Sequence, residues 1–558
     1  MASPSVDYLS GVDHYRHGRL AEALDCFRRH LALVPDDFQG HICAGVVLEA
    51  LQRSADAADH YLQAVRLHPD PVYHYTVGCV LRKLRDRGRA EDEAAQYEAA
   101  LRLRPDYPEA WHSLAGLRLA QGRHDEVMRV CLRGLERIPD DPQLNHTAAL
   151  AHFFQGRDAE ARTYLDRSNR LAIARWDSQL DGHVRAQPRR WFARPGNTVE
   201  LFTDTAGHPY GFESPRVLGA CPWPLPALRY RQQRVYRVTL RNVFVEGLLG
   251  YIYDDEAVYA NASVGLQGVW RLFTEAPRKH PRITMPVGKI VSVHQPNWEN
   301  YYHWMAECLV RLVLLKEVLD ADSEVRALVP AAKAPKFIQE SLDLIGLDEA
   351  RLIRDRAGPQ QRYQASEITY VDWSPPLSEL AAEELAALWY PPRAALQRVR
   401  RVLAEPHPPV QERTHVLYLC RSYPEQVRGI AQESTLVDGL RRIVGAGLVV
   451  FTGKEPLRQQ VELFRHARIV IGPHGAGLTN LLFCAPGTSV VEFPIVPMRL
   501  NHYGHLAAAL DLDYWLVPGL EAHYQGHYTI TAENLAEVLS LVKRLLSEPQ
   551  AADHSSSA

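Results

Sequence analysis

One cluster of polar side chains has residue types and a spacing that suit proton transfer. In the run NYYHWMAECLVRL, His303, Glu307 and Arg311 recur every four residues, so they share one face of a helix. An imidazole accepts a proton near neutral pH, and a carboxylate one turn away can orient it or bind a hydroxyl group. A polar stripe turned to solvent would show the same spacing. The apolar neighbours Trp304 and Leu309 favour a helix that is buried on most sides, with the polar face in a cleft.

A second cluster lies in ARIVIGPHGAGLTNLLFCAPGTSVVEFP, which reads as strand, glycine loop, helix, turn and strand. The loop consists of His474, Gly475, Ala476 and Gly477. Small residues let the backbone turn sharply, and a helix N-terminus that follows such a loop offers free N–H groups and a positive dipole end to a phosphate. Ordinary parallel α/β proteins also contain such turns, and the run lacks the spacing of GxGxxG and of the Walker loop. Glu492, at the end of the next strand, could accept hydrogen bonds from ribose hydroxyls or stabilise a loop.

Arginines follow another strand, in LYLCRSYPEQVRGIAQE. Arg421 and Ser422 come directly after the strand, and Arg428 lies in the loop that follows. A guanidinium binds two oxygens at once and keeps its charge, so this pair of arginines suits a diphosphate, although surface salt bridges would need the same residues. Lys454, in FTGKEPL, lies at the end of the next strand and could line the pocket for the nucleobase or the phosphates of the donor.

These motifs resemble a known family. GPHGAGLTNLLFCAPGTSVVE resembles the signature of the family 61 glycosyltransferases, and the HW…E…R run and the arginine segment resemble two further family motifs. The resemblance extends, more weakly, over residues 235 to 545. It implies an inverting transfer from a nucleotide sugar, a UDP-sugar above all, by a GT-B fold of two Rossmann-like domains whose ligand lies between the facing sheets.

The resemblance also suggests roles for the residues. His303 would be the catalytic base with support from Glu307, with Glu307 itself and His474 as competing bases, and Arg311 would lie on the acceptor side. The residues implied in donor binding are Arg421, Ser422, Arg428, Lys454, His474, Gly475, Ala476, Gly477, Asn480 and Glu492.

The first 175 residues repeat. Pro-Asp occurs at residues 35, 69, 105 and 139, at separations of 34, 36 and 34, and each pair follows an amphipathic helical segment. A period of 34 with paired helices is typical of tetratricopeptide repeats, and we count five. Such repeats bury small residues, here Ala23, Ala57, Ala94 and Ala161, and leave a groove for an acceptor or partner protein. A spacer or a dimerisation surface is the alternative.

The rest of the chain divides into four further parts. Residues 176–233 read as a linker or lid, 234–405 as a first, acceptor-side Rossmann-like domain, 406–548 as a second, nucleotide-sugar-binding domain with a C-terminal helix, and 549–558 as a disordered tail. Expected strands of the first domain are 234–245, 249–253, 289–294 and 326–330, and expected helices are 304–319, 333–345 and 378–390. Expected strands of the second are 414–420, 448–451, 468–471, 489–493 and 514–517, with helices at 433–444, 456–466, 478–483, 502–510 and 532–546.

Composition limits the remaining possibilities. The 558 residues carry a formal net charge of −3 with 46% hydrophobic residues, which gives no support for a nucleic-acid partner. No apolar run is long enough for a transmembrane segment, and neither a signal peptide nor a CxxC pair is present, so we expect a cytoplasmic protein that a partner could hold at a membrane. No metal or other cofactor is expected, because the DxD of Asp511 and Asp513 sits at a helix-to-strand turn.

The sequence therefore predicts an α-solenoid of repeats followed by a metal-independent glycosyltransferase of polysaccharide biosynthesis, acting on a glycan or protein hydroxyl. The alternative is a repeat scaffold that binds a nucleotide sugar without turnover and organises a glycan-assembly complex. Release of UDP with and without an acceptor would distinguish the two.

Overall fold

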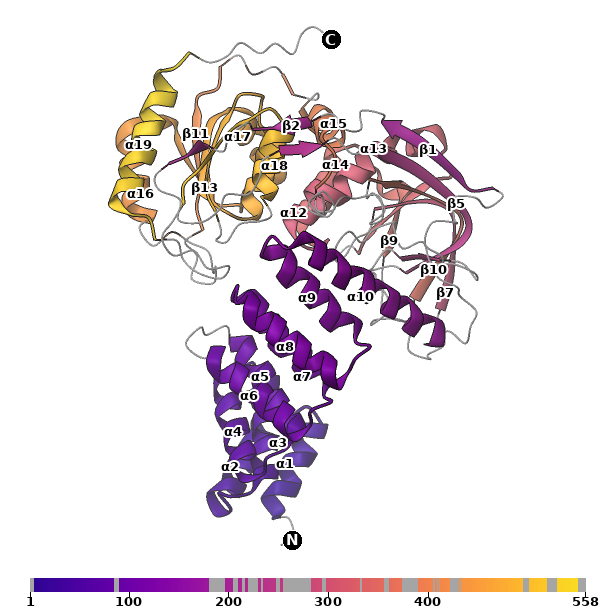
Figure 1. Ribbon diagram of the computed structural model, residues 1–558, viewed down its shortest axis with the longest axis vertical. Coiled ribbons are helices and arrows are strands. Elements are labelled where there is room, and N and C mark those ends of the chain that lie inside the picture. The colour runs from indigo at the N-terminus through magenta and orange to yellow at the C-terminus, as the bar shows by residue number, and fades with distance from the viewer. Residues whose placement is uncertain are drawn as a thin grey trace. The chain divides into compact units, whose positions relative to one another are not determined.

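The computed structural model forms two compact units, residues 1–155 and 156–558 (Figure 1). It describes residues 5–84, 90–179, 196–203, 209–212, 216–218, 229–231, 234–246, 251–253, 283–293, 298–331, 334–355, 361–373, 390–404, 407–408, 410, 412–421, 430, 433–494, 501–518 and 529–549. The expected helix at 378–390, all but its last residue, and the tail from 550 lie outside the described residues.

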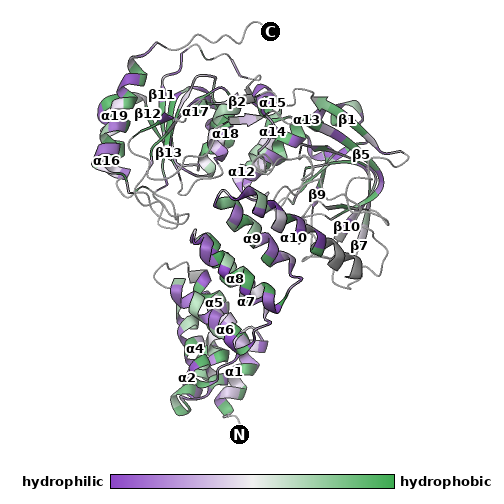
Figure 2. Cartoon of the chain, viewed as in Figure 1, coloured by the Kyte–Doolittle hydropathy of each residue, from purple (hydrophilic) through white to green (hydrophobic). Residues whose placement is uncertain are grey.

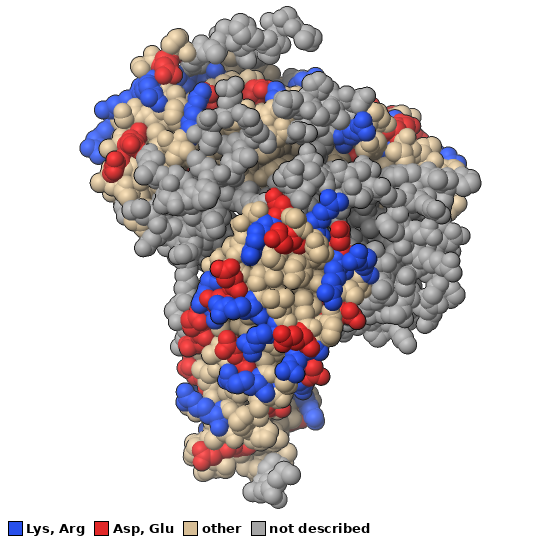
Figure 3. Space-filling view, viewed as in Figure 1, with Lys and Arg blue, Asp and Glu red and all other residues tan. Residues whose placement is uncertain are grey.

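The repeats form paired helices. Helices α1 to α10 are Val6–Arg16, Leu20–Leu33, Phe38–Ala50, Ser54–Leu67, Pro71–Leu84, Ala90–Leu103, Pro108–Ala120, His124–Arg137, Pro142–Phe154 and Asp158–Gln179. Aspartates cap the N-termini of two of these helices. The Asp37 and Asp141 carboxylates accept hydrogen bonds from the first free N–H groups of α3 and α9. The four small residues expected in the interior are at most 2% exposed, as a close helix-to-helix approach requires. Figure 3 shows both signs of charge mixed over the visible face of these repeats.

The second unit contains a parallel sheet of six strands. In spatial order these are β12 (Leu448–Phe451), β11 (His415–Leu419), β13 (Ala467–Pro473), β14 (Ser489–Phe493), β15 (Asp513–Leu516) and β3 (Arg216–Val217). All neighbours pair in parallel. From β11 the chain moves to β12 on one side and then to β13, β14 and β15 on the other, which is the doubly wound order with its switch point between β11 and β13. The expected linker supplies the edge strand β3, so part of it belongs to this sheet.

The other sheet is mixed. Strands β10 (Gln361–Asp372), β7 (Ile283–Ser292), β8 (Arg326–Pro330) and β9 (Leu352–Asp355) run parallel in that order. Strand β5 (Val235–Glu246) lies antiparallel beside β10, and β1 (Thr198–Thr203) and β6 (Tyr251–Tyr253) lie antiparallel to β5. A small ribbon pairs β2 (Pro209–Gly211) with β4 (Arg229–Arg231).

The two sheets share one hydrophobic core. Between them lie α12 (Tyr301–His303), the π-helix η5 (Trp304–Cys308), α13 (Leu309–Ala321), α14 (Lys336–Leu344), α15 (Arg393–Ala404), α17 (Leu457–Arg465), the 3₁₀ helix η10 (Ala476–Phe483) and α18 (His502–Ala509). On β11, Leu417 and Leu419 join this core, whereas Val416 and Tyr418 face α16 (Glu433–Val444) and α19 (Ala532–Ser547). Alternation along a strand produces the two faces, and Figure 2 shows β11 and β13 as largely apolar.

Most elements expected in residues 406–548, which form the parallel sheet and its helices, are confirmed within two residues. The helix expected at 478–483 is a 3₁₀ helix. The elements missed in or beside the other sheet include β1, β9, β10 and α15. Among the described residues, no helix combines the length and the apolar character that crossing a membrane requires.

Two glycines of the repeats should respond in opposite ways to alanine. A Cβ at Gly45, in α3, would come within 2.6 Å of the Tyr61 ring, whereas a Cβ at Gly116, in α7, would meet no atom within 4 Å. We expect Gly45→Ala to cost about 1–3 kcal/mol by overpacking and Gly116→Ala to gain about 0.5–1 kcal/mol through helix propensity. Thermal melts followed by circular dichroism should move the transition of the repeats in opposite directions. Equal shifts would contradict the packing described here.

Candidate active site

The candidate base lies on the helical segment that follows β7. Asn300 caps α12 by accepting a hydrogen bond from the Tyr302 N–H, and the chain continues through η5 into α13. His303 Nδ1 lies 3.1 Å from Glu307 Oε2, with 21% and 14% of the two side chains exposed. Burial lowers the pKa of His303, but the charge and hydrogen bond of Glu307 outweigh it, so the pKa stands above its usual 6.5.

A π turn, η5, which contains Glu307, interrupts this helix between His303 and Arg311. The backbone N–H of Leu309 donates to the Trp304 carbonyl, one residue farther back than in an α-helix. The Arg311 guanidinium does not bind the Glu307 carboxylate. It donates to the Glu307 backbone carbonyl at 3.3 Å, and it stacks 4.0 Å above the ring of Trp373, which follows β10. The residue is 7% exposed, and its Nε has no hydrogen-bond partner among the described residues.

The glycine loop lies at the switch point of the parallel sheet. Arg421 follows β11 and donates from Nη1 to the carbonyl of His474, directly after β13. Gly475 has an extended backbone with φ of 164°, so it is not needed for a sharp turn. It is needed for close approach, because a Cβ there would overlap the Arg421 guanidinium. Glycine thus lets the arginine lie across the start of η10.

His474 is held by a buried network. Its Nδ1 lies 2.6 Å from Glu492 Oε1, and the other Glu492 oxygen accepts a hydrogen bond from the Tyr514 hydroxyl. The Tyr514 hydroxyl oxygen also lies 3.1 Å from Asn501 Oδ1. Glu492 is fully buried with both oxygens engaged. The geometry therefore favours the second of the two roles that the sequence left open for Glu492, a structural carboxylate that holds the loop of His474.

Aromatic rings connect His303 with His474. The ring of Tyr302 lies 5.4 Å from that of His303 and 6.0 Å from that of Tyr503, and the Tyr503 ring lies 4.9 Å from His474. His502 adjoins the same group, 4.9 Å from Tyr302. The two candidate histidines thus approach one aromatic cluster. His303 follows a strand of the mixed sheet, and His474 follows a strand of the parallel sheet.

His502 is a neutral imidazole in this cluster. Burial and then the charges of His474, His303 and His505 lower the pKa of His502 to about 3. Its Nδ1 and the hydroxyl of the buried Tyr302 have no hydrogen-bond partner among the described residues. Buried polar atoms are nearly always paired, so these two atoms indicate a place for a polar ligand or water.

Buried hydrogen bonds join the helices of the two sheets beside this cluster. The Tyr301 hydroxyl donates to Asn480 Oδ1, and Asn480 Nδ2 donates to Gln460 at 2.9 Å. Asn480 is 1% exposed, so we assign it to this link rather than to the donor. Glu340 of α14 accepts from the Leu457 N–H at 2.9 Å and thereby caps α17.

The remaining predicted donor residues are only partly placed. Ala476 and Gly477 form the first residues of η10, and Lys454 lies exposed in the turn after β12. Ser422 and Arg428 lie outside the described residues. The carboxylates of Asp511 and Asp513 bind Arg393 and Arg216, at 2.7 and 3.1 Å.

Sequence reasoning missed Tyr301, Tyr302, Trp373 and His502 as members of the site. A signal existed for the tyrosines, because they directly precede His303 in the quoted motif. The sequence offered no such signal for His502. Its meaning depends on contacts with residues about 200 positions earlier in the chain.

The pKa of His303 offers a test of the pair. Because Glu307 stabilises the imidazolium, we expect the pKa of His303 to exceed 6.5 and to fall in Glu307→Gln. The charged pair should stabilise the fold below about pH 6.5, and this contribution should be lost as the pH rises through the folded-state pKa. Titration of the histidine ring protons by NMR measures both variants.

His415 is the internal control, since burial and then the charge of His466 lower its pKa without any part for Glu307. A His303 signal that titrates identically in the wild type and in Glu307→Gln would show that the pair does not form.

Comparisons with known proteins find matches in both parts of the chain. The model of the glycosyltransferase 61 family matches residues 301–491, and two tetratricopeptide repeat models match residues 8–70 and 84–150. A β-1,2-xylosyltransferase of Oryza sativa subsp. japonica is 28% identical over 87 residues, which are 16% of this chain and 15% of that protein. One of Arabidopsis thaliana is 29% identical over 83 residues, 15% of each. This chain thus matches about 15% of the length of these relatives.

Solved structures resemble part of the chain. The tetratricopeptide protein YrrB, described as having an unusual peptide-binding site, matches with 18% identity and a TM-score of 0.27 over 30% of this chain and 86% of its own. The MamA protein matches with 16% identity and a TM-score of 0.29 over 34% of this chain and 100% of its own. At these scores neither bears on function. The family matches identify residues 301–491 as a glycosyltransferase 61 domain, in a chain whose N-terminal part consists of tetratricopeptide repeats.

Proposed function

We propose that the second unit is an inverting glycosyltransferase that moves a sugar from a UDP-sugar to a hydroxyl group of a glycan or protein acceptor. The observation that carries the proposal is the convergence of two groups on one aromatic cluster, namely the His303–Glu307 pair and the switch-point loop of His474. The first group suits a base, and the second suits a diphosphate. The family match supports the reaction class.

The donor is assigned to the switch point of the parallel sheet. Ligands of doubly wound sheets bind outside the carboxyl ends of the strands, where the strand order reverses. Here that place lies between β11 and β13, and both strands end in residues of the candidate site, Arg421 and His474. The guanidinium and the N-terminus of η10 would neutralise the departing diphosphate without a metal ion.

The acceptor is assigned to the other side of the cluster. Glu307 engages Nδ1 of His303, and we assign Nε2 as the atom that takes the proton of the acceptor hydroxyl. Arg311 of α13 stacks on Trp373, which follows the carboxyl end of β10, and the two would border the acceptor. Residues that follow strands of both sheets thus approach each other, which supports a GT-B type arrangement despite the shared core.

The transferred sugar would lie between these two sides. A sugar hydroxyl both donates and accepts hydrogen bonds, so it can pair with the Tyr302 hydroxyl and with Nδ1 of the neutral His502. Because the curated relatives are β-1,2-xylosyltransferases, UDP-xylose is the first donor to examine. The repeats would recruit the acceptor or a protein partner, as such grooves commonly do.

UDP binding should depend on Gly475 through Arg421. We expect Arg421→Ala to weaken UDP by about 1.5–3 kcal/mol, the range for hydrogen bonds to charged groups. Gly475→Ala should cost a similar amount, because the new Cβ would displace the guanidinium. The double variant should lose little more than either single variant, since both remove the same contact. Calorimetry on the full chain measures all three affinities.

The control is Arg442→Ala, which removes an exposed arginine of α16 and should leave UDP affinity unchanged. Additive losses in the double variant would show that Gly475 and Arg421 contribute separately, and an unchanged Arg421→Ala affinity would exclude that residue from the site.

Replacing the base should affect turnover rather than donor binding. General bases typically contribute about 10²–10⁴-fold, so His303→Gln should lower kcat at least about 100-fold in EDTA-containing buffer while its UDP affinity stays within about twofold. Initial rates of UDP release give kcat, and calorimetry gives the affinity. If His303→Gln keeps kcat within about tenfold, the proton must pass to another residue, with Glu307 next in line.

A further inference from the structure

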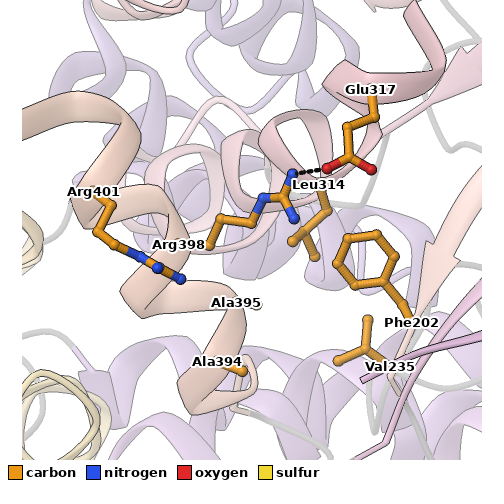
Figure 4. Close-up of a pocket in the computed structure, with 8 residues that line it drawn as sticks. All are labelled: Phe202, Val235, Leu314, Glu317, Ala394, Ala395, Arg398 and Arg401. Carbon is orange, nitrogen blue, oxygen red and sulfur yellow. Dashed lines mark hydrogen bonds and ion pairs between the residues drawn. The ribbon is translucent and has the colours of Figure 1, made fainter. Parts of the chain in front are cut away.

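A cavity lies away from the candidate active site, where α13 and α15 meet β1 and β5 (Figure 4). Its volume is about 340 Å³, at the small end of the range for ligand sites. One wall is apolar and is formed by Phe202, Val235 and Leu314. Ala394 lines the cavity on α15, and its short side chain leaves the space open.

The other wall is cationic. Four arginines lie on α15, and three have identified partners. Arg393 pairs with Asp511, Arg400 donates to the Leu510 carbonyl at 2.7 Å, and Arg398 pairs with Glu317 of α13. Arg401 lines the cavity and forms no hydrogen bond or ion pair with any residue that the structure describes.

Figure 4 shows the guanidinium of Arg401 extending along α15 toward Arg398, whose own guanidinium binds Glu317. Two guanidinium groups with one carboxylate leave an excess of positive charge at this wall. Phe202 lies under Arg398, with its ring centre 5.4 Å from the guanidinium carbon. An occupant of matching chemistry would therefore place an anionic group between Arg398 and Arg401 and an apolar body against Phe202 and Leu314.

We propose that this cavity binds a small organic carboxylate with an aromatic or compact aliphatic body. The carboxylate replaces Glu317 as the partner of Arg398 and gives Arg401 a counter-ion. The apolar body is buried against the wall of β1, β5 and α13. This inference does not depend on the transferase proposal, because the cavity shares none of its lining residues with the candidate active site.

Because the ligand competes with Glu317 for Arg398, the proposal predicts opposite effects of two substitutions on ligand affinity. Removing that carboxylate frees Arg398, so Glu317→Gln should tighten binding, whereas Arg401→Gln should weaken it. Filling the cavity with Ala394→Leu should weaken binding with no change in charge. Each substituted side chain is at least partly exposed, so the fold should persist, and circular dichroism checks that it does.

The test is a titration of the full chain with benzoate, followed by ligand-observed NMR and calorimetry. We expect saturable binding, with Kd raised roughly threefold to tenfold by Arg401→Gln, as for a partly exposed charged contact. Glu317→Gln should lower Kd by a similar factor. Benzamide, which has the same shape without the charge, should bind at least about tenfold more weakly.

Inorganic phosphate distinguishes a general anion site from the proposed one. Phosphate should compete weakly, because it has no apolar body to bury. Equal affinity for phosphate and benzoate would overturn the assignment of ligand class. Absence of saturable benzoate binding, or a Kd that Arg401→Gln and Ala394→Leu leave unchanged, would overturn the site itself.

Discussion

The candidate site depends on the buried hydrogen bonds that join the helices of the two sheets. Tyr301 donates to Asn480, Asn480 donates to Gln460, and the surrounding core is continuous from α13 to η10. Buried polar groups that lose a partner cost more than the bonds contribute, so this link fixes the register between α12 and η10. Because Tyr301 stands two residues before His303, the same link sets where the candidate base lies relative to the loop of His474.

The histidines around this link differ in their surroundings, and two of them differ in their pKa values. A neighbouring carboxylate raises the pKa of His303, whereas burial and surrounding positive charge lower that of His502. Side chains of one type can therefore serve as a proton acceptor and as a neutral hydrogen-bonding group in one site. His474 has a third environment, held by the buried carboxylate of Glu492. The shape of the cluster follows from the folding of both sheets around one core.

Local sequence patterns predicted those helices and strands whose own residues show a clear helix or strand pattern. The parallel sheet was predicted well because short β-branched runs alternate there with helices, as in Arg468 to Ile471. Helix α15 was missed, although two prolines directly precede it and proline commonly starts a helix. The π turn of η5 could not be predicted from hydrophobic periodicity, because the segment is apolar on most sides. Glycine at 475 was assigned to a turn, but its reason is the approach of Arg421, a contact between distant segments.

The central claim is that the second unit turns over a nucleotide sugar at this cluster. The most direct measurement is proton NMR of the full chain with UDP-xylose in EDTA, with and without a sugar acceptor, followed from the first minutes. The account predicts that UDP accumulates and that the first product carries the anomeric configuration opposite to that of the donor. A UDP-sugar that binds and stays intact through a panel of donors and acceptors would contradict it, and would instead support a scaffold that binds the donor without turnover.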